Sequence, residues 1–282
     1  MTDPRPWAYS AFRVEVSARR LLSPRFLRLT FSGDDLRHFA PWGVDQRIKV
    51  VLPMADGTIA DFGLLAEPTP HPSDWYARWR ALPEGERNVL RTYTPAEIRP
   101  ERGEIDVDFF LHEPAGPASA WARAAEIGER LVITGPDARN GYTGYGIHWA
   151  PGEATRFLLT ADETAYPAAR NILRSLPPAA SVDLFVDALD LADDVLSAAA
   201  PSGVRVHVVP RGPHPCDRLQ EAVRSWSAAS PGLAGDPGFF AWLAGESASV
   251  AGVRRLLTRE VGVPKERVAF LGYWRQGGPL VD

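Results

Sequence analysis

The feature that most constrains the fold is a change of hydrophobic pattern near the middle of the 282-residue chain. The first half carries short segments in which apolar and polar residues alternate, at 12–16, 26–31, 47–52, 104–111 and 130–134. This alternation is typical of strands with one buried face, and Pro and Gly residues separate the segments. The first half is therefore predicted to form a small antiparallel β-barrel with one short helix at 117–125.

In the second half, strand patterns alternate with helix patterns. The predicted strands are 156–160, 182–186, 204–209, 239–243 and 268–271, and the predicted helices are 164–175, 191–199, 217–227 and 247–260. Such alternation predicts a mainly parallel, Rossmann-like α/β sheet. The glycine-rich stretch from Gly135 to Gly152 sets the domain boundary, giving domains 1–150 and 151–282. Residues 67–87 are expected to be a polar excursion of low order.

Composition excludes several classes of protein. Hydrophobic residues make up 45% of the chain and charged residues 23%, which is typical of a soluble globular protein. The net charge of −4 disfavours nucleic acid as a partner. With the single cysteine Cys216, no internal disulfide and no multi-cysteine metal site can form. The sequence has no signal-peptide pattern and no apolar run that could span a membrane, so a cytoplasmic protein is expected.

The segment Arg91-Thr92-Tyr93-Thr94 carries the strongest functional signal. A flavin dinucleotide needs an aromatic ring against its isoalloxazine and a guanidinium for its pyrophosphate, and this segment supplies both. The alternative is an ordinary strand end with surface polar residues. The α/β half that follows favours the flavin interpretation.

A second signal is Gly116-Pro117-Ala118-Ser119, which opens the predicted helix at 117–125. Proline fits the first helical turn because its missing N–H would be unpaired there anyway. The segment is either plain helix-start chemistry or a site where free N–H groups bind a pyrophosphate, and we favour the second.

A third signal is Ala161-Asp162-Glu163-Thr164-Ala165, which follows the first strand of the α/β half. Open α/β sheets bind ligands at the carboxyl ends of their strands. The alternative is a helix N-cap by Asp162 or Thr164. Two acids there would repel a pyrophosphate, so a nicotinamide nucleotide would lie differently from one in an ordinary Rossmann site.

Other groups carry weaker signals. Gly141 to Gly146 lacks a nucleotide-loop spacing and is expected to be a flexible inter-domain loop. His207, His214 and Cys216 match no zinc pattern, and no metal site is predicted. Lys49, Arg91 and Arg275 are scattered in the sequence, and from the sequence alone they are three solvated charges.

Taken in order, the motifs resemble the siderophore-interacting protein family, a branch of the flavin reductases in the ferredoxin-reductase superfamily. The matching segments are Arg91 to Thr94, Asp108 to His112, Gly116 to Trp121, Gly135-Pro136, Ala161 to Ala165, Ala244 to Glu246 and Gly272 to Arg275. One departure is visible, because Pro95-Ala96-Glu97 follows the first motif where many relatives carry a basic residue.

The resemblance implies an antiparallel six-stranded FAD-binding β-barrel followed by a Rossmann-like NAD(P)H-binding α/β domain, with site residues in four groups. The FAD set is Arg91, Thr92, Tyr93, Thr94, Asp108, Phe109, Phe110, Leu111, His112, Gly116, Pro117, Ala118 and Ser119. The NAD(P)H set is Asp162, Glu163, Thr164, Ala165, Gly245 and Glu246. A basic pocket for an anionic siderophore is implied at Lys49, Arg91 and Arg275. Tyr273 and Trp274 would lie on a C-terminal tail that returns to the flavin.

The resemblance further implies a reductase that uses FAD and NAD(P)H to convert the Fe(III) of a ferric siderophore to Fe(II), with no catalytic side chain. One alternative is a flavoenzyme of the same fold that reduces a ferredoxin, a flavodoxin or free flavin. A second is a siderophore-binding protein without turnover. The donor stays open between NADH, NADPH and a reduced ferredoxin, since Arg205 and Arg211 could meet a 2′-phosphate or be ordinary surface residues. A monomer is expected.

Overall fold

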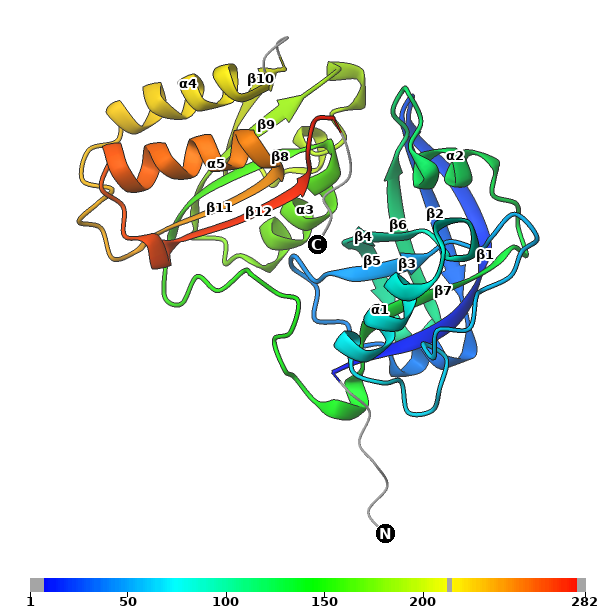
Figure 1. Ribbon diagram of the computed structural model, residues 1–282. Coiled ribbons are helices and arrows are strands. Elements are labelled where there is room, and N and C mark those ends of the chain that lie inside the picture. The colour runs from blue at the N-terminus through cyan, green and yellow to red at the C-terminus, as the bar shows by residue number, and fades with distance from the viewer. Residues whose placement is uncertain (1–7, 212–214, 278–282) are drawn as a thin grey trace. The chain divides into compact units, whose positions relative to one another are not determined.

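The structure, a computed structural model, describes residues 8–211 and 215–277, and for residues 215–217 it describes the backbone only. The chain divides into two compact units, Met1–Ile147 (unit 1) and His148–Asp282 (unit 2). The sequence analysis set the boundary at 150/151. Figure 1 shows the antiparallel sheet of unit 1 and the parallel sheet of unit 2. Among the described residues, no helix is long and apolar enough to cross a membrane.

Unit 1 is built on a curled antiparallel sheet. Its strands are β1 (Tyr9–Ser23), β2 (Phe26–Ser32), β3 (Ile48–Val51), β4 (Leu90–Tyr93), β5 (Pro95–Arg99), β6 (Glu104–Phe110) and β7 (Arg130–Pro136). Their order in the sheet is β4-β3-β7-β1-β2-β6-β5.

The strand count of the sequence analysis needs correction, because the sheet has seven strands where six were predicted. The two edge strands, β4 and β5, are consecutive in the chain and are separated only by Thr94. One bent stretch of chain therefore pairs with β3 at one edge and with β6 at the other.

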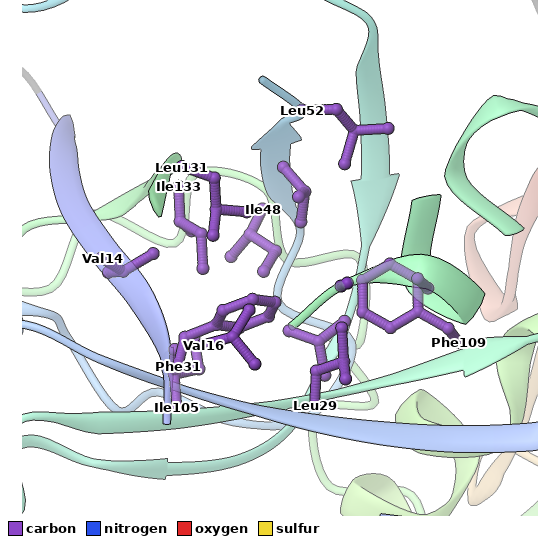
Figure 2. Close-up of a cluster of buried hydrophobic side chains, with 14 of the residues drawn as sticks. Val14, Val16, Leu29, Phe31, Ile48, Leu52, Ile105, Phe109, Leu131 and Ile133 are labelled. Atoms are coloured by element: carbon purple, nitrogen blue, oxygen red, sulfur yellow. The ribbon is translucent and has the colours of Figure 1, made fainter. Parts of the chain in front are cut away.

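Two apolar clusters stabilise unit 1, one on each face of the sheet. Figure 2 shows the inner cluster, where Val16, Leu29, Phe31 and Phe109 come together from β1, β2 and β6. These side chains are buried because alternate residues of each strand point to the same face. Complete burial of one such side chain contributes about 1.5–3 kcal/mol.

The outer cluster contains a helix in the segment that was predicted to have low order, residues 67–87. Helix α1 (Pro72–Ala81) begins after His71, whose ring accepts a hydrogen bond from the Ser73 N–H at 3.1 Å. Trp75 is buried against Phe62. The polar composition of the segment concealed this helix, which depends on tertiary contacts of a few large rings.

The remaining helix of unit 1, α2 (Pro117–Ala124), was predicted correctly within one residue. Ala118 and Ala122 pack on the inner cluster, together with the half-buried Trp121.

Unit 2 is an all-parallel sheet with helical connections. Its strands are β8 (Arg156–Asp162), β9 (Ser181–Ala188), β10 (Val204–Pro210), β11 (Phe239–Glu246) and β12 (Val268–Trp274), in the order β10-β9-β8-β11-β12. The first strand is central, and the chain reverses its direction of winding between β8 and β11. At such a switch point the carboxyl ends of the strands leave room for a ligand.

The helices of unit 2 are α3 (Tyr166–Ser175), α4 (Pro215–Ala228) and α5 (Ser247–Arg255). Residues of α4 and α5 share one apolar cluster with β8, β9, β11 and β12. The chain continues from α5 into a π-helical turn, Leu256–Glu260, so the helix predicted at 247–260 changes its hydrogen bonding at its last third.

The prediction of a helix at 191–199 is wrong. Two short 3-10 turns, Leu191–Asp193 and Ser197–Ala199, occupy this connection. The Asp190 carboxylate accepts a hydrogen bond from the Ala192 N–H, and that of Asp194 accepts one from the Ser197 N–H. Aspartates that bind nearby backbone N–H groups favour turns over a continuous helix. Other 3-10 turns lie at Asp34–His38, Glu84–Glu86, Pro100–Arg102, Ala138–Asn140, Glu163–Ala165 and Lys265–Arg267.

Candidate functional site

The Arg91-to-Thr94 motif forms the end of β4 and the junction with β5. Cross-strand pairing sets Val50 opposite Arg91, Ile48 opposite Tyr93 and Lys49 opposite Thr92. Because directly paired residues share a face, Arg91 and Tyr93 lie on the face of the inner cluster. Lys49 lies on the other face, where its Nζ donates a hydrogen bond to Thr92 Oγ1 at 2.8 Å.

Tyr93 connects the motif to the helix α2 through an aromatic chain. Its ring centroid lies 4.7 Å from that of Phe109, and Phe109 lies 5.9 Å from Trp121 of α2. Burial raises the pKa of the Tyr93 phenol, although the charge of Arg91 acts in the opposite direction. The Tyr93 hydroxyl therefore stays protonated at neutral pH.

Arg91 is half-buried, and its Nη1 donates to the Leu90 carbonyl oxygen at 2.8 Å. A guanidinium has five N–H donors in a planar fork, so this one bond leaves donors that can bind two phosphate oxygens.

The predicted FAD residues in and just after β6 contact neighbouring strands and loops of unit 1. Asp108 accepts two hydrogen bonds from Arg28, at 2.6 and 2.8 Å, so its carboxylate joins β6 to β2. Phe110 packs on Phe26 of β2, and the Leu111 N–H donates to the Arg25 carbonyl oxygen. Among the described contacts, Asp108, Phe110 and Leu111 support the strand that leads to α2.

The start of α2 presents backbone donors. Gly116 is the N-cap, and among the described residues no side chain caps this helix end. Pro117 has no N–H, so the donors of the first turn belong to Ala118 and Ser119. Ser119 is buried, and its Oγ accepts a hydrogen bond from the His112 N–H at 3.2 Å.

Two further contacts shape this helix start. His112 Nδ1 donates to the Pro114 carbonyl oxygen at 2.7 Å. A Cβ added at Gly116 would lie only 3.3 Å from the His112 ring, so the absence of a side chain lets the ring approach. Together with Arg91 and Tyr93, these groups fit a flavin dinucleotide, because an open helix start and a guanidinium both favour a pyrophosphate.

The predicted nucleotide residues of unit 2 lie at the carboxyl ends of β8 and β11, which are neighbours in the sheet. Asp162 Oδ1 accepts hydrogen bonds from the backbone N–H and the hydroxyl of Thr164, at 2.9 and 2.5 Å. Asp162 therefore caps the 3-10 turn Glu163–Ala165, whereas α3, the helix that the sequence analysis expected it to cap, begins after Ala165 without a side-chain cap. Ala165 is completely buried.

Glu163 is buried and forms an ion pair inside unit 2. Its Oε2 lies 2.6 Å from Arg211 Nη2, and its Oε1 accepts a hydrogen bond from the Leu189 N–H. Burial raises the pKa of Glu163, with Arg211 opposing the rise and Asp162 adding to it. Arg211 also contacts Asp187 at 3.3 Å.

Glu246 caps α5. Its Oε2 accepts hydrogen bonds from the Ala248 and Ser249 N–H groups, at 2.7 and 2.8 Å. Gly245 has a φ of 142° and lies so close to Asp162 that an added Cβ would be 2.7 Å from Oδ2. Glycine is therefore needed here, both for the backbone conformation and for the carboxylate beside it.

The arginines considered for a 2′-phosphate are both engaged within the unit. Arg205 binds Asp183 at 2.6 Å, and Arg211 is held by Glu163 and Asp187. His207 also contacts Asp183 at 2.9 Å. His214 lies outside the described residues, as does the side chain of Cys216.

The C-terminal motif ends β12. Trp274 Nε1 donates to Asp162 Oδ2 at 2.7 Å, Tyr273 is half-buried and Arg275 is exposed. Arg275 belongs to unit 2, whereas Lys49 and Arg91 belong to unit 1. The convergence of these three charges, and the return of the tail to the flavin, stay predictions.

Sequence reasoning missed Ser247, which donates to the Trp274 carbonyl oxygen at 2.8 Å. It also missed Asp187, the second acid that contacts Arg211. Both follow or end a parallel strand, so their place at the same sheet edge was the signal that could have found them.

The curled antiparallel sheet followed by a parallel sheet defines a protein of the ferredoxin-reductase-like fold. A ferredoxin reductase in carbazole 1,9a-dioxygenase shares this fold, with 19% identity, a TM-score of 0.62, and coverage of 94% of this chain and 70% of that chain. Two family models match the sequence: a siderophore-interacting FAD-binding domain at residues 15–140 and a siderophore-interacting protein at residues 154–277. The chain belongs to the siderophore-interacting protein family.

Individual relatives agree with this assignment. An uncharacterized protein of Mycobacterium tuberculosis is 32% identical over 277 residues, covering 93% of this chain and 89% of the relative. The ferric vibriobactin reductase ViuB of Vibrio cholerae is 26% identical over 259 residues, covering 92% and 87%. The crystal structure of a siderophore utilization protein from T. fusca is 25% identical, with a TM-score of 0.73 and coverage of 98% and 97%.

The chain also matches part of a much longer relative. The mycobactin import ATP-binding/permease protein IrtA of Mycolicibacterium smegmatis is 30% identical over 217 residues, which are 76% of this chain. The match covers only 23% of IrtA, so this chain corresponds to about a quarter of that relative.

Proposed function

We propose that this protein is an FAD-dependent reductase that converts the Fe(III) of a ferric siderophore to Fe(II). The observation that carries the proposal lies in unit 1, where Phe109 contacts the Tyr93 ring of the Arg91-to-Thr94 motif and Trp121 of α2. The similarity to a ferric vibriobactin reductase supports the choice of substrate.

In unit 1, the Arg91 guanidinium and the N–H groups of Ala118 and Ser119 bind the pyrophosphate of FAD. The Tyr93 ring packs against the isoalloxazine, with Thr94 beside it at the strand junction. Bound FAD supplies the redox chemistry that connects a two-electron donor with a one-electron acceptor.

The substrate side needs positive charge, since ferric siderophores with oxygen ligands are anionic. Lys49 and Arg275 provide it, whereas Arg91, which lies on the opposite face of the sheet from Lys49, binds the pyrophosphate. Reduction lowers the charge of the iron, and hard oxygen ligands hold Fe(II) more weakly than Fe(III), so iron is released without an acid or base from the protein.

The donor is NADH or NADPH, bound at the carboxyl ends of β8 and β11 by the segments 162–165 and 245–246. The parallel sheet and its switch point support this site. A reduced ferredoxin is the second candidate donor, because Glu246 already caps α5 and the start of this helix is therefore not open to a pyrophosphate. We further propose a monomer that acts in the cytoplasm.

An anaerobic visible spectrum of the FAD-loaded protein tests the function. NADH, NADPH or a reduced ferredoxin is added first, and then a ferric tris-catecholate or a ferric tris-hydroxamate. Bleaching of the flavin by one donor and return of the colour with the ferric chelate is the expected result. A protein that binds no FAD, or a bleached flavin that no ferric chelate reoxidises, contradicts the proposal.

A further inference from the structure

Three sequence motifs that are far apart in the chain meet at one edge of the sheet of unit 2. They are the ends of β8 at Asp162, β11 at Glu246 and β12 at Trp274, and these strands lie in the order β8-β11-β12. At this edge the carboxylates of Asp162 and Glu246 accept hydrogen bonds from other residues of unit 2.

The first contact crosses the middle strand. Trp274 Nε1 on β12 donates to Asp162 Oδ2 on β8 at 2.7 Å, and β11 lies between them. Gly245 of β11 leaves space for this bond, because a Cβ there would be 2.7 Å from the same oxygen. Asp162 is 2% exposed, so water competes little for the carboxylate.

Two more contacts fix the backbone on either side of Arg275. Ser247 Oγ donates to the Trp274 carbonyl oxygen at 2.8 Å, and the Gln276 N–H donates to Glu246 Oε1 at 3.3 Å. A Cβ at Gly272 would lie 2.3 Å from Ser247 Oγ, so glycine is needed for the serine to reach this strand.

The Trp274 ring has a second partner besides Asp162. The Arg211 guanidinium lies 5.9 Å from the ring centroid, and ion pairs with Glu163 and Asp187 hold this arginine. The ring is therefore located by its N–H and by a cation over its face.

We propose that Asp162, Glu246 and Ser247 are positioning residues that fix the segment Trp274–Gln276 and thereby hold Arg275 for the anionic ferric chelate. The inference rests on the proposed function only for the role of Arg275. The backbone on both sides of Arg275 is bonded, whereas its side chain is exposed. A fixed backbone reduces the conformational entropy that an arginine loses when it binds an anion.

The variant Trp274→Phe tests the proposal because it keeps an aromatic ring and removes only the indole N–H. Trp79→Phe is the matched control: Trp79 is also half-buried and donates to the Asn88 carbonyl oxygen at 2.8 Å, but it lies in α1 of unit 1. The first readout is hydrogen exchange of the backbone amides of residues 271–277, which does not depend on activity.

Exchange of these amides is expected to become about tenfold faster in Trp274→Phe and to stay unchanged in Trp79→Phe, because a hydrogen bond to a charged acceptor has been lost. Ser247→Ala should act in the same direction. Asp162→Asn, which keeps an oxygen acceptor, should restore most of the protection that Asp162→Ala loses. Equal exchange in Trp274→Phe and Trp79→Phe would overturn the proposal.

The second readout is steady-state kinetics with a ferric tris-catecholate. Trp274→Phe is expected to raise KM for the chelate about five- to tenfold, with a smaller change in kcat, since Arg275 is displaced but present. Faster exchange with an unchanged KM would overturn the link between the fixed segment and the substrate. A wild-type protein that reduces no ferric chelate would overturn the proposed function, while hydrogen exchange would still decide whether the segment is anchored.

Discussion

At the scale of single residues, Thr94 shows how one position organises unit 1. It is buried, and it joins the two edge strands of the sheet. Arg91 and Tyr93 therefore lie within three residues of the point where the chain passes from the pairing with β3 to the pairing with β6. The Arg91-to-Thr94 motif is held from both sides, which reduces the loss of entropy when a cofactor binds.

Arg91→Ala is expected to weaken FAD binding by about 10- to 100-fold, the range for loss of charge-assisted hydrogen bonds to a phosphate. Titration with FAD, followed by flavin fluorescence, measures the change. Arg102→Ala, an exposed arginine of the same unit, is the control and should leave the affinity unchanged. Equal affinities of Arg91→Ala and the wild type would place the pyrophosphate elsewhere.

Lys49→Ala and Arg275→Ala are expected to raise KM for a ferric chelate while FAD stays bound, with about a three- to tenfold effect for each lost charge at a partly exposed site. Kinetics at low and high salt measure it, and the effect should shrink at high salt. Unchanged kinetics in both variants would contradict the basic pocket.

Asp187 gives a pH-dependent prediction. Burial raises the pKa of Asp187 to about 7, with Arg211 opposing the rise and Asp162 and Glu163 adding to it. In the unfolded chain the pKa of an aspartate is about 3.9. Between about pH 3.9 and pH 7, the folded state therefore keeps a proton on Asp187 that the unfolded state has lost. Stability should therefore fall as the pH rises from about 4 to 7.

Asp187→Asn should remove this loss, leaving stability near pH 4 unchanged and raising it near pH 8 by up to about 4 kcal/mol, the value of a shift of about three pKa units. Urea unfolding at the two pH values measures the difference. A variant that is less stable than the wild type at pH 8 would mean that the ion pair with Arg211 outweighs the burial of the charge.

At the scale of secondary-structure elements, an ion-pair network connects three neighbouring strands of unit 1. Asp106 of β6 accepts two hydrogen bonds from Arg99 of β5, at 3.0 and 2.8 Å, and one from Thr30 of β2 at 2.8 Å. Burial alone would raise the pKa of Asp106, but these hydrogen bonds lower it below its ordinary value. The carboxylate is therefore charged and stabilising at neutral pH.

Asp106→Ala is expected to cost about 3 kcal/mol of unfolding free energy at pH 7, because Arg99 and Arg28, whose Nη1 lies 3.7 Å from Asp106 Oδ2, both lose a buried partner. A carboxylate with a lowered pKa stabilises above its unfolded pKa and stops doing so as the pH falls through its folded pKa, so the cost should shrink as the pH falls below about 3.9, the pKa of an unfolded aspartate. Denaturant unfolding measures it, with the exposed Glu101→Ala as control. An equal loss of unfolding free energy at pH 7 and at acid pH would show that the effect comes from packing and not from the charge.

Element prediction succeeded where the signal was local. Strands such as 130–134 and the helix at 117–125 follow from alternation and from Pro117 in the first turn. It failed for 191–199, where two aspartates compete for backbone N–H groups, and for α1, whose tryptophans are stabilised by residues far away in sequence.

At the scale of the whole molecule, each unit has its own apolar core. The groups that fit FAD all belong to unit 1, and the buried acids with Arg211 belong to unit 2. A ligand that binds one unit should therefore stabilise that unit directly.

FAD at about 100 times its Kd should add about 2.7 kcal/mol to the stability of unit 1 and raise the Tm of its transition by about 5–10 °C. Calorimetry with and without FAD measures this shift. Trp79→Phe, which alters only unit 1, identifies the transition by lowering its Tm. A shift of the unit 2 transition alone would contradict the assignment of the cofactor.

The sequence by itself determined the alternation of strands and helices in unit 2 apart from 191–199, the Arg91-to-Thr94 motif, the open start of α2 and the resemblance to the family, because periodicity, turn residues and short motifs act over a few neighbouring positions. Only the tertiary structure decided that Lys49 and Arg91 lie on opposite faces of the sheet, that Asp162 binds Trp274, and that Glu246 caps α5. These facts depend on strand register and strand order, which the packing of whole sheets fixes and no local pattern encodes.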